Sequence, residues 1–424
     1  IKKALKSNVK LSVSSSISLD ETSNSCQFVT PDHHYLESWC DYQPVGSTFT
    51  LGQPTISPVF DTRQMQESLL TWAGAIDAYS ENTMKDNGIY GQEHSVSPFY
   101  NYIKSKWSVT DKEFNTYLHD GFVIKDTPTI SVPGMIANTD EIASEIEKSK
   151  SAADGIEITL IEKTGMLGGV LSNNPLVQEL PDPISKVTWH NYIALSKMNA
   201  VRLGINDNDV VNITVGETKM VLPAIVQPGQ ANGTASIHLG FGRTVAGKVA
   251  KGRGENAYAL IQAGAKFNSY VVNGAKVEKT STGETYELAR TQTHHHIEGR
   301  DIVRETTLED YKKDNRAGNR YEKPELVSLW YDHDYRKAGA PNHLWGMAID
   351  MNKCTGCAAC IVSCSIENNV PVVGEVEVRR RREMHWLRID RYYSSEESFD
   401  GDESKLKEAV SKFRFLLSFI YSKN

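Results

Sequence analysis

The residues with the clearest chemistry are four cysteines within eleven positions, namely Cys354, Cys357, Cys360 and Cys364. Their spacing, C-x2-C-x2-C-x3-C, is one with which thiolates ligate iron–sulfur clusters, three of them binding one cluster and the fourth binding another. Gly356 suits a tight loop in which the backbone wraps closely around the inorganic sulfides. The sequence therefore predicts that these four cysteines are iron–sulfur ligands. Each cluster needs a further ligand, which the sequence does not reveal.

Two other uses of cysteine fit this run less well. Structural zinc sites pair two cysteines with a second pair or with histidines at a set distance, whereas the nearest histidines, His343 and His385, are poorly spaced. Disulfide frameworks belong to small, cysteine-dense domains, and six cysteines in 424 residues do not make one. The remaining two, Cys26 and Cys40, are expected to be ordinary half-buried thiols.

Length and composition limit the classes of protein to which this chain can belong. A chain of 424 residues has room for about two to four domains. It is 39% hydrophobic and 23% charged, and its net charge of -7 argues against a nucleic-acid partner. It contains no apolar run of the roughly 18 residues that a membrane-spanning helix needs, and no signal sequence opens it. Because it begins at Ile1, inside what reads as a strand, we expect it to be an internal piece of a longer protein.

The first part of the chain mixes both kinds of secondary structure. Residues Val9 to Val13 alternate between apolar and polar, which predicts a half-buried strand. Asp61 is expected to cap a helix whose apolar residues recur at three- and four-residue spacing as far as Ile76. Helical stretches are expected between residues 80 and 130.

From about residue 185 the pattern changes to short β-rich runs separated by Gly, Asn, Asp and Pro. A short helix is expected over 193–203, followed by strands over 210–215, 221–229 and 234–239. Strands at intervals of about 8 to 12 residues predict a small barrel.

The last of these strands leads into a glycine-rich stretch that contains Gly240, Gly242 and Arg243. Backbone amides there could approach a phosphate, with Arg243 as the counter-charge. A tight turn within the barrel needs the same glycines, and we favour that structural role.

Two histidine tracts are candidates for metal binding. His33 and His34 are adjacent, but no carboxylate or cysteine stands at ligand spacing from them. In His294-His295-His296, three consecutive side chains cannot all face one ion on a strand or a helix. Both tracts are therefore expected to be polar structure rather than metal sites.

The C-terminal part carries two further patterns. Residues 298 to 340 read as a charged connector that ends at a Gly/Pro turn, Gly339-Ala340-Pro341. Val376 to Arg382 is predicted as a strand that places Arg379, Arg380, Arg381 and Arg382 on both faces, some of them near an anionic cluster or partner. Lys405 to Tyr421 is predicted as an amphipathic helix, whose apolar face from Leu406 to Ile420 favours packing against protein over lipid.

Taken together, these pieces resemble known families. Ser196 to Gly247 resembles the C-terminal dinucleotide-binding barrel of the molybdopterin oxidoreductases, and Asp32 to Trp39 with Gln53 to Pro58 resembles part of their large α/β body. Cys354 to Asn369 is similar to the first motif of the four-cluster electron-transfer subunits that accompany such enzymes. Barrel and cluster motif on one chain, with the phrase Trp345 to Asp350, resemble the large iron–sulfur subunit of bacterial alternative complex III.

The resemblance implies a fold class of α/β and β. It implies three regions: the C-terminal part of a molybdopterin-oxidoreductase-like α/β body over 1–184, a double-psi β-barrel with its connector over 185–338, and a partial ferredoxin-type iron–sulfur domain over 339–424. The family's remaining cluster motifs should follow residue 395, where this chain instead runs into an acidic stretch.

The resemblance also implies a function without a catalytic residue on this chain. It is that of an electron-transfer subunit in a membrane-bound respiratory quinol:cytochrome c oxidoreductase. The implied cofactors are 4Fe–4S clusters, with 3Fe–4S as a candidate additional cluster type, and no molybdopterin. The implied partners are integral membrane quinol-binding subunits and heme c subunits on the periplasmic side of the bacterial inner membrane, with attachment through protein and no nucleic acid. The alternative is a catalytic molybdopterin oxidoreductase of the polysulfide or DMSO reductase kind with a fused iron–sulfur domain.

Overall fold

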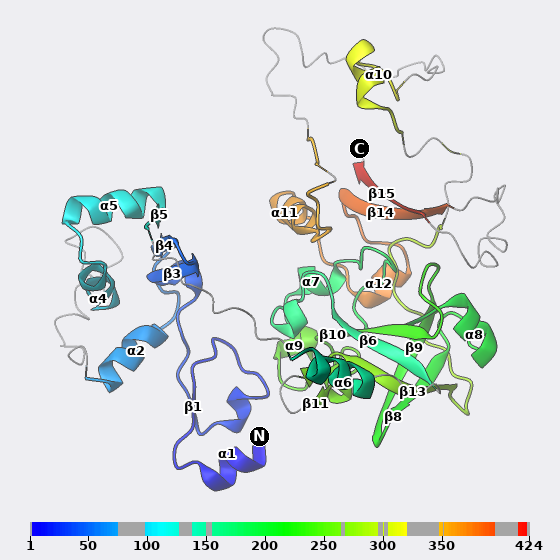
Figure 1. Ribbon diagram of the computed structural model, residues 1–424, viewed down its shortest axis with the longest axis horizontal. Helices are drawn as coiled ribbons and strands as arrows, with labels where there is room; N and C mark the ends of the chain where they lie inside the picture. Colours follow the sequence, from blue (N-terminus) through cyan, green and yellow to red (C-terminus); the bar gives the residue numbers. More distant parts are fainter. Residues whose placement is uncertain are drawn as a thin grey trace. The chain divides into compact units, whose positions relative to one another are not determined.

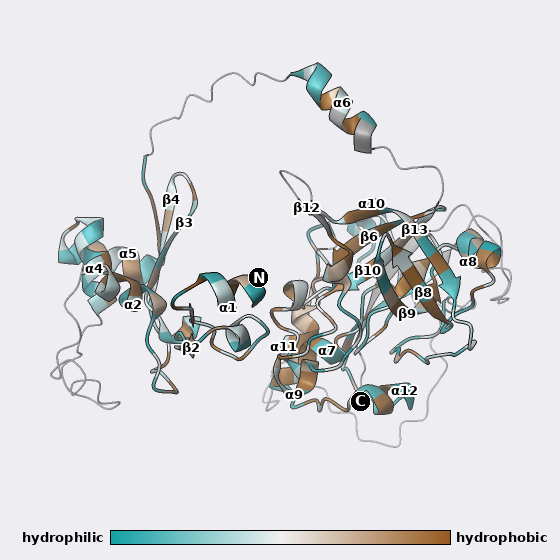
Figure 2. Ribbon diagram, turned by 90° about the horizontal axis from the view of Figure 1, so that it is seen from below, coloured by the Kyte–Doolittle hydropathy of each residue, from teal (hydrophilic) through white to brown (hydrophobic). Residues whose placement is uncertain are grey.

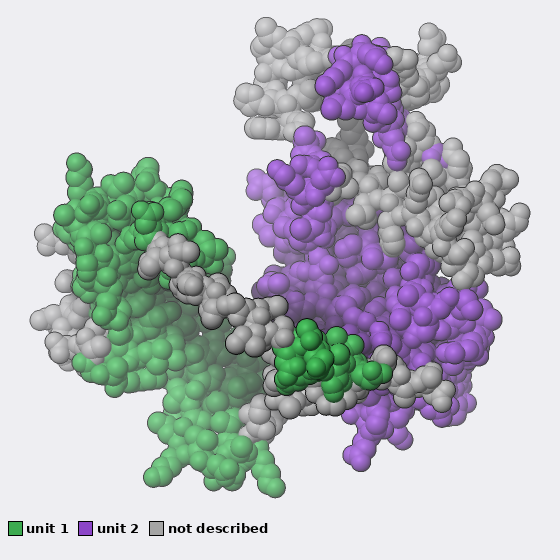
Figure 3. Space-filling view, viewed as in Figure 1, with its two compact units in different colours: residues 1–150, 244–247 green, residues 151–243, 248–424 purple. Residues whose placement is uncertain are grey.

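The computed structural model describes residues 2–74, 98–126, 138–149, 155–263, 268–295, 300, 304–319, 347–350, 352–394 and 414–421. Its chain divides into two compact units, which Figure 3 colours separately. The first comprises residues 1–150 with 244–247, and the second comprises residues 151–243 with 248–424. Each unit has a hydrophobic core of its own.

The first unit is built around a three-stranded antiparallel sheet in the order β3-β4-β5. Leu51 of β4 is buried with Phe99 and Ile103 of α4 and Phe114 of α5, so these two helices and the sheet share one core. The helices and strands are α1 (Lys2–Asn8), β1 (Val13–Ser14), η1 (Ser23–Ser25), β2 (Phe28–Val29), η2 (Tyr35–Glu37), β3 (Cys40–Val45), β4 (Thr48–Gly52), α2 (Met65–Trp72), α4 (Pro98–Trp107), α5 (Asp111–Asp120), β5 (Phe122–Ile124) and α6 (Thr139–Ser149) (Figure 1).

Two sequence predictions in this unit are wrong in detail. The chain opens with the helix α1 rather than a strand, and β1 holds only Val13 and Ser14, since Lys, Ala and Leu favour helix over residues 2–8. The predicted helix begins at Met65 instead of following Asp61. Asp32, from far upstream, accepts a hydrogen bond from the Met65 backbone N–H at 2.8 Å and so satisfies the start of the helix. The helix ends at Trp72, and Ile76 lies outside the described residues.

The second unit contains a closed six-stranded barrel in the order β10-β6-β13-β8-β9-β7. The helices and strands of this unit are β6 (Ile156–Glu162), η3 (Leu167–Gly169), α7 (Pro175–Glu179), β7 (Ile193–Leu195), α8 (Lys197–Leu203), β8 (Val210–Val215), β9 (Thr218–Val226), β10 (Thr234–Leu239), α9 (Gly247–Ala250), η4 (Ala257–Leu260), β11 (Gln262–Ala263), β12 (Asn268–Ser269), β13 (Val271–Lys279), α10 (Leu308–Lys313), α11 (Ala359–Glu367), α12 (Glu375–Arg379), β14 (Leu387–Ser394) and β15 (Arg414–Tyr421).

A closed barrel is present, as the strand spacing predicted, and it includes three strands that the sequence did not assign to it, β6, β7 and β13. β6 pairs in parallel with β10 and antiparallel with β13, so the barrel takes in residues upstream of residue 185. The chain also enters the strand β7 at Ile193 before the helix α8 begins at Lys197, which divides the single predicted helix into two elements. Ser196 caps α8 by accepting a hydrogen bond from the Asn199 N–H at 3.1 Å.

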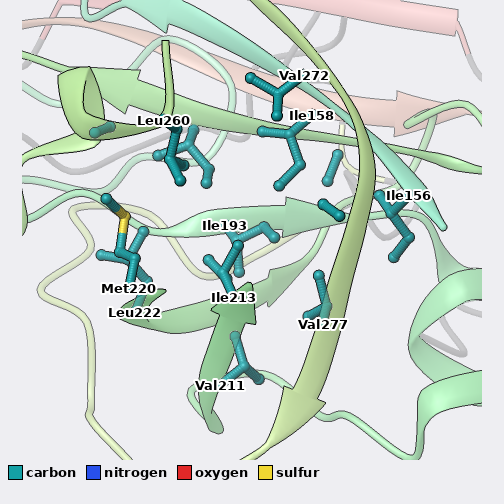
Figure 4. Close-up of a cluster of buried hydrophobic side chains, with 14 of the residues drawn as sticks. Ile156, Ile158, Ile193, Val211, Ile213, Met220, Leu222, Leu260, Val272 and Val277 are labelled. Atoms are coloured by element: carbon teal, nitrogen blue, oxygen red, sulfur yellow. The ribbon is translucent and has the colours of Figure 1, made fainter. Parts of the chain in front are cut away.

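Every second side chain along a barrel strand points inward, and these side chains fill the barrel interior. Ile156, Ile158 and Leu160 of β6 are buried, whereas the residues between them are partly exposed. Figure 4 shows Ile156 and Ile158 together with side chains of the other barrel strands, such as Ile213 and Val272. In Figure 2, strands such as β8 and β9 carry much of the hydrophobic colour. The barrel thus has a continuous apolar core without any contribution from the cysteine segment.

The C-terminal segment differs from prediction at two places. Glu375–Arg379 is the helix α12 rather than a strand, and the Arg379 guanidinium lies 2.6 Å from the Glu375 carboxylate, one helical turn away. Arg414–Tyr421 is the strand β15 rather than a helix, and it pairs antiparallel with β14 over eight residues. Its aromatic and β-branched residues favour a strand, and β14 supplies the hydrogen-bonding partner. Residues 405–413 lie outside the described residues.

Candidate metal centre

The four predicted ligands lie on one short loop and the helix that follows it. Cys354 and Cys357 are on the loop, and Cys360 and Cys364 are on α11, one turn apart and therefore on one face. The first three side chains are exposed, and that of Cys364 is half-buried. All four are free thiols. The loop and the helix α11 alone therefore keep the four cysteines in one short segment of the structure.

The loop reaches the helix through two left-handed residues. Gly356 has a φ of 69°, which a glycine adopts without steric cost, and Ala358 has a φ of 59° immediately before α11. The backbone N–H of Ala359, at the start of the helix, bonds to the Cys357 sulfur and, with the Thr355 side chain, lowers the pKa of Cys357 below its ordinary value. The turn therefore favours the thiolate at Cys357, which is the form that binds metal.

α11 is anchored by an apolar contact with β14. Ala358 and Ile361 are buried together with Leu387 and Ile389 of β14 and with Leu180, which follows α7. Cys364 packs against this cluster, and Asn368 donates a side-chain hydrogen bond to the Cys364 carbonyl at 2.8 Å. Figure 1 shows α11 beside β14. One ligand thus lies against a core and the other three are open to solvent.

Glu179 fixes the segment that follows α11. Its buried carboxylate accepts hydrogen bonds from the backbone N–H groups of Val373 and Gly374, at 3.1 and 2.7 Å, and from the indole N–H of Trp189 at 3.1 Å. A charged acceptor with three donors is well satisfied in a buried position. This single side chain joins the end of α7 to the chain just before α12.

Glu375 makes a second link. Its carboxylate lies 2.6 Å from the guanidinium groups of Arg253 and of Arg379, and it also accepts a hydrogen bond from the Tyr286 hydroxyl at 2.5 Å. The side chain is only 7% exposed, so these partners offset the cost of burying the charge. The arginine run therefore begins with a structural ion pair.

β14 makes a third link through two buried cations. Arg391 donates hydrogen bonds to the carbonyls of Ile184 and His294, at 2.6 and 2.9 Å. The Lys186 ammonium donates to the carbonyl of Ile389. Burial in an environment of low polarity lowers the pKa of Lys186 to about 8. The cysteine segment is therefore tied to the barrel by charged hydrogen bonds as well as by apolar contact.

The types of donor atom that the described residues offer show which metal group would fit them. Four thiols with small neighbours and an N–H directed at one sulfur fit an iron–sulfur group in donor type. In the described part of the chain, no three His, Cys, Asp or Glu side chains are grouped closely enough to hold a metal ion. Ligation by Cys354, Cys357, Cys360 and Cys364 therefore stays a prediction from their spacing.

The glycine-rich loop has a structural explanation. A Cβ on Gly240 would lie 2.9 Å from the backbone nitrogen of Gly169, and a Cβ on Gly242 would lie 2.1 Å from that of Asn256. Both glycines also have positive φ. Arg243 donates hydrogen bonds to the Gly169 carbonyl at 2.9 Å and the Ser172 hydroxyl at 3.3 Å. The close approach of backbone segments within the barrel unit therefore requires Gly240 and Gly242. The sequence had also made these glycines candidates for a phosphate site.

The histidines have local partners. His33 Nε2 lies 3.0 Å from the Thr62 carbonyl, and His34 Nδ1 accepts a hydrogen bond from the Leu36 N–H at 3.3 Å. His294 and His295 offer backbone carbonyls to β14, and His296 lies outside the described residues. These contacts agree with the expected structural roles.

Cys26 and Cys40 are half-buried, as expected. The Cys26 thiol donates to the Thr22 carbonyl at 3.5 Å, and Cys40 lies on β3. Both belong to the first unit, whereas the cysteine loop belongs to the second.

Sequence reasoning missed the buried charged residues that hold the cysteine segment, Glu179, Glu375, Lys186 and Arg391. One signal was present, because Gly374 followed by Glu375 and Arg379 four residues later is compatible with a short helix. The contacts that tie these residues to distant parts of the chain span between 89 and 207 positions and leave no local pattern.

Comparisons with known proteins give partial similarities, and no family model matches the chain. It is 23% identical over 247 residues, 57% of its length, to the menaquinone reductase molybdopterin-binding-like subunit of Nitratidesulfovibrio vulgaris. It is 44% identical over 43 residues, 10% of its length, to the iron–sulfur cluster-binding subunit of the menaquinone reductase of the same organism. It is 50% identical over 36 residues, 8% of its length, to a tetrathionate reductase subunit of Salmonella typhimurium.

The chain spans only part of each relative, 33% of the first and 16% and 14% of the other two. Among solved structures, acetylene hydratase from Pelobacter acetylenicus matches with a TM-score of 0.38 and 12% identity, over 62% of this chain and 39% of that one. The sequence similarities support a molybdopterin-oxidoreductase-like relationship together with one to iron–sulfur subunits, and they do not single out alternative complex III.

The helices are also relevant to membrane attachment. Within the ranges that the structure describes, none of them combines the length and the apolar character that a bilayer crossing requires.

Proposed function

We propose that this chain is an electron-transfer subunit of a membrane-bound respiratory quinol:cytochrome c oxidoreductase of the alternative complex III kind. In this proposal Cys354, Cys357, Cys360 and Cys364 hold iron as thiolates, and the barrel belongs to a molybdopterin-like region without molybdenum. The chain would lie on the periplasmic side of the bacterial inner membrane as a peripheral subunit, with integral quinol-binding subunits and heme c subunits as partners.

The observation that carries the proposal is the occurrence of two kinds of similarity on one polypeptide. The relatives from Nitratidesulfovibrio vulgaris are named as two different subunits of a menaquinone reductase, one molybdopterin-binding-like and one iron–sulfur cluster-binding. This chain is similar to both, and its barrel and cysteine segment fall in one compact unit. A chain that combines both regions is better suited to passing electrons between subunits than to acting as a separate catalyst.

The residues of this chain have definite tasks in the proposal. Bound iron–sulfur clusters would supply one-electron transfer, with potentials set by hydrogen bonds and nearby charge. The Ala359 N–H favours the thiolate of Cys357, and the contact of Ile361 with Leu387 keeps α11 in place. Arg243, held by the Gly169 carbonyl, acts as part of the barrel.

Metal analysis of the protein purified from its native host tests this function. We expect iron and acid-labile sulfide in stoichiometric amounts, and no molybdenum. Absence of iron from protein that retains its other subunits would contradict the electron-transfer role and leave a scaffold.

The alternative function is a catalytic molybdopterin oxidoreductase acting on a small inorganic or sulfur substrate. It is favoured by one observation, the similarity to the tetrathionate reductase subunit. Stoichiometric molybdenum, with reduction of a sulfur substrate by the purified protein, would establish this alternative and overturn the first proposal.

Attachment to membrane partners has its own test. Arg379, Arg380 and Arg382 form ion pairs with Glu375 and Glu377, so two carboxylates of the chain already compensate part of the charge of the arginine run. We expect a wash with 1 M salt, which shortens the Debye length from about 8 to about 3 Å, to leave the protein on native membranes. Detergent should then release it with heme-bearing and multi-span subunits. Release by salt as a free protein would count against the complex.

A further inference from the structure

A cavity of about 380 Å³ lies beside β14, apart from the cysteine loop. Its volume falls within the range of small-molecule sites, about 300 to 1,000 Å³. The lining residues share polar or charged side chains and are Thr291, Gln292, Thr293, His294, Arg300, Arg381, Arg388, Asp390 and Tyr392. None of these is among the four predicted metal ligands, so the cavity is distinct from the predicted metal centre.

The alternation of β14 turns one set of side chains towards the cavity. Arg388, Asp390 and Tyr392 are two residues apart from one another and share a face of the strand. The residues between them face the other way, as the burial of Ile389 with Leu387 against α11 shows. The cavity wall is therefore built on a regular element that is itself anchored in a core.

Charge is concentrated in this cavity. Three guanidinium groups and one carboxylate line it, which gives a formal charge of +2 with His294 neutral. The single carboxylate, Asp390, is held by Arg388 at 3.2 Å and its side chain is only 7% exposed. Arg381 donates from one nitrogen to the Arg290 carbonyl at 2.9 Å and lies with its other nitrogen 3.4 Å from the Thr293 hydroxyl. These contacts pre-orient two of the guanidinium groups at the wall.

We propose that this cavity binds a small molecule that carries a phosphate or a similar doubly charged oxyanion. Arginine forks match the oxygen pairs of such groups, and a formal charge of +2 matches a dianion. The hydroxyls of Thr291 and Thr293 can donate to further oxygens, and Asp390 can accept from a hydroxyl of the ligand. Because the cavity exceeds the size of one phosphate ion, a phosphate ester fits the space better than the free ion does.

Calorimetric titration of the purified protein with inorganic phosphate and with glycerol 3-phosphate tests the site. We expect saturable binding of both at constant ionic strength, with the ester tighter. Arg381→Gln should raise the Kd about tenfold, which corresponds to about 1.4 kcal/mol. Arg388→Lys keeps a charge beside Asp390 but loses the planar fork, and it should raise the Kd about threefold or more.

Arg382→Gln is the matched control. It removes the same charge one residue from Arg381, but Arg382 pairs with Glu377 and does not line the cavity. We expect its Kd to stay within about twofold of the unchanged protein. Equal weakening by Arg382→Gln, or equal heats with chloride, would show diffuse attraction and overturn the proposal, as would absence of saturable binding to protein that is folded by circular dichroism. The clusters play no part in this titration, so its outcome is independent of the proposed function.

Discussion

The Arg253 guanidinium lies 2.6 Å from the carboxylate of Glu375, although 122 positions of sequence separate the two residues. Arg253 precedes η4 in the barrel unit, and Glu375 begins α12 a few residues after the cysteine helix. The cation also lies 5.2 Å from the Trp189 ring, and the Trp189 indole N–H bonds to Glu179. These contacts form one connected group, through which the cysteine segment depends on the barrel for its position.

Replacement of Glu179 tests this dependence. Glu179→Gln puts an amide where a carboxylate accepts three hydrogen bonds, so at least one buried N–H loses its partner. We expect a loss of about 3 kcal/mol in the free energy of unfolding, measured by urea denaturation. Glu377→Gln is the control, since Glu377 makes surface ion pairs, and it should change stability by less than about 1 kcal/mol. Equal effects of the two variants would show that Glu179 does not hold the segment.

Replacement of a predicted ligand tests the metal centre. Cys357→Ser removes the thiol whose pKa is lowered by the Ala359 N–H, and it should lower the iron content and abolish a low-potential electron paramagnetic resonance signal. The barrel should stay folded, because its core contains no residue of the cysteine segment. Cys26→Ser is the matched control in the other unit and should leave iron and spectrum unchanged. An unaltered iron count in Cys357→Ser would show that Cys357 is not a ligand.

Arg243→Ala distinguishes an empty barrel from one that binds a dinucleotide. Arg243 bonds to the Gly169 carbonyl and the Ser172 hydroxyl, so its loss should cost about 1 to 3 kcal/mol of stability. Quinol oxidation by the assembled complex should stay nearly intact. If turnover collapses while the subunits still assemble, Arg243 serves a bound cofactor and the barrel is not merely structural.

Lys163 makes stability depend on pH. Its ammonium is buried without a hydrogen-bond partner, and desolvation lowers its pKa from 10.5 to about 8. Between these two values the unfolded chain binds more protons than the folded chain, so stability should rise with pH across this window and stay at its lower level below pH 8. The full contribution is about 3 kcal/mol.

Lys163→Met should therefore stabilise the protein at pH 7, by about 3 kcal/mol at most, and reduce the rise between pH 8 and 10. Part of the rise should remain, because the pKa of Lys186 is also lowered to about 8. The measurement is the free energy of unfolding in urea at several pH values. Lys276→Met is the control, because the Lys276 side chain is 69% exposed, and it should leave the slope unchanged. A slope as steep in Lys163→Met as in the unchanged protein would show that Lys163 does not contribute to it.

The barrel is predictable from sequence because its strands carry strong local patterns. The strand predicted over 234–239 has the same bounds in the structure, and the glycines of the following loop form the tight structural turn that we favoured. β6 carries the same local alternation, but its place in the barrel is not predictable in this way, because its partners β10 and β13 lie far along the chain. Strand pairing over such sequence distances cannot be detected from a short stretch of sequence.

The errors around the cysteine segment have a different cause. In residues 375–379 the valines alternate as in a strand, and in residues 414–421 the apolar residues also fit a helical face, so each short pattern suits two structures. Contacts decide the outcome: the Glu375–Arg379 pair closes one turn of helix, and β14 offers an edge to β15. The cysteine spacing, by contrast, is a local pattern and needs no distant partner to be recognised.

The pairing of β6 with β13 also affects how this protein is assembled. Ile156 is opposite Ala275, so the barrel closes only after a long stretch of chain has been made and folded back, and contacts of such high sequence separation slow folding. Glu179, Ile184 and Arg253, which contact the cysteine segment, lie between these two strands in the sequence. The cysteine loop itself needs only its own eleven residues. Three of its four thiols stay exposed even after the barrel has closed, so closure of the barrel alone does not protect them from oxidation.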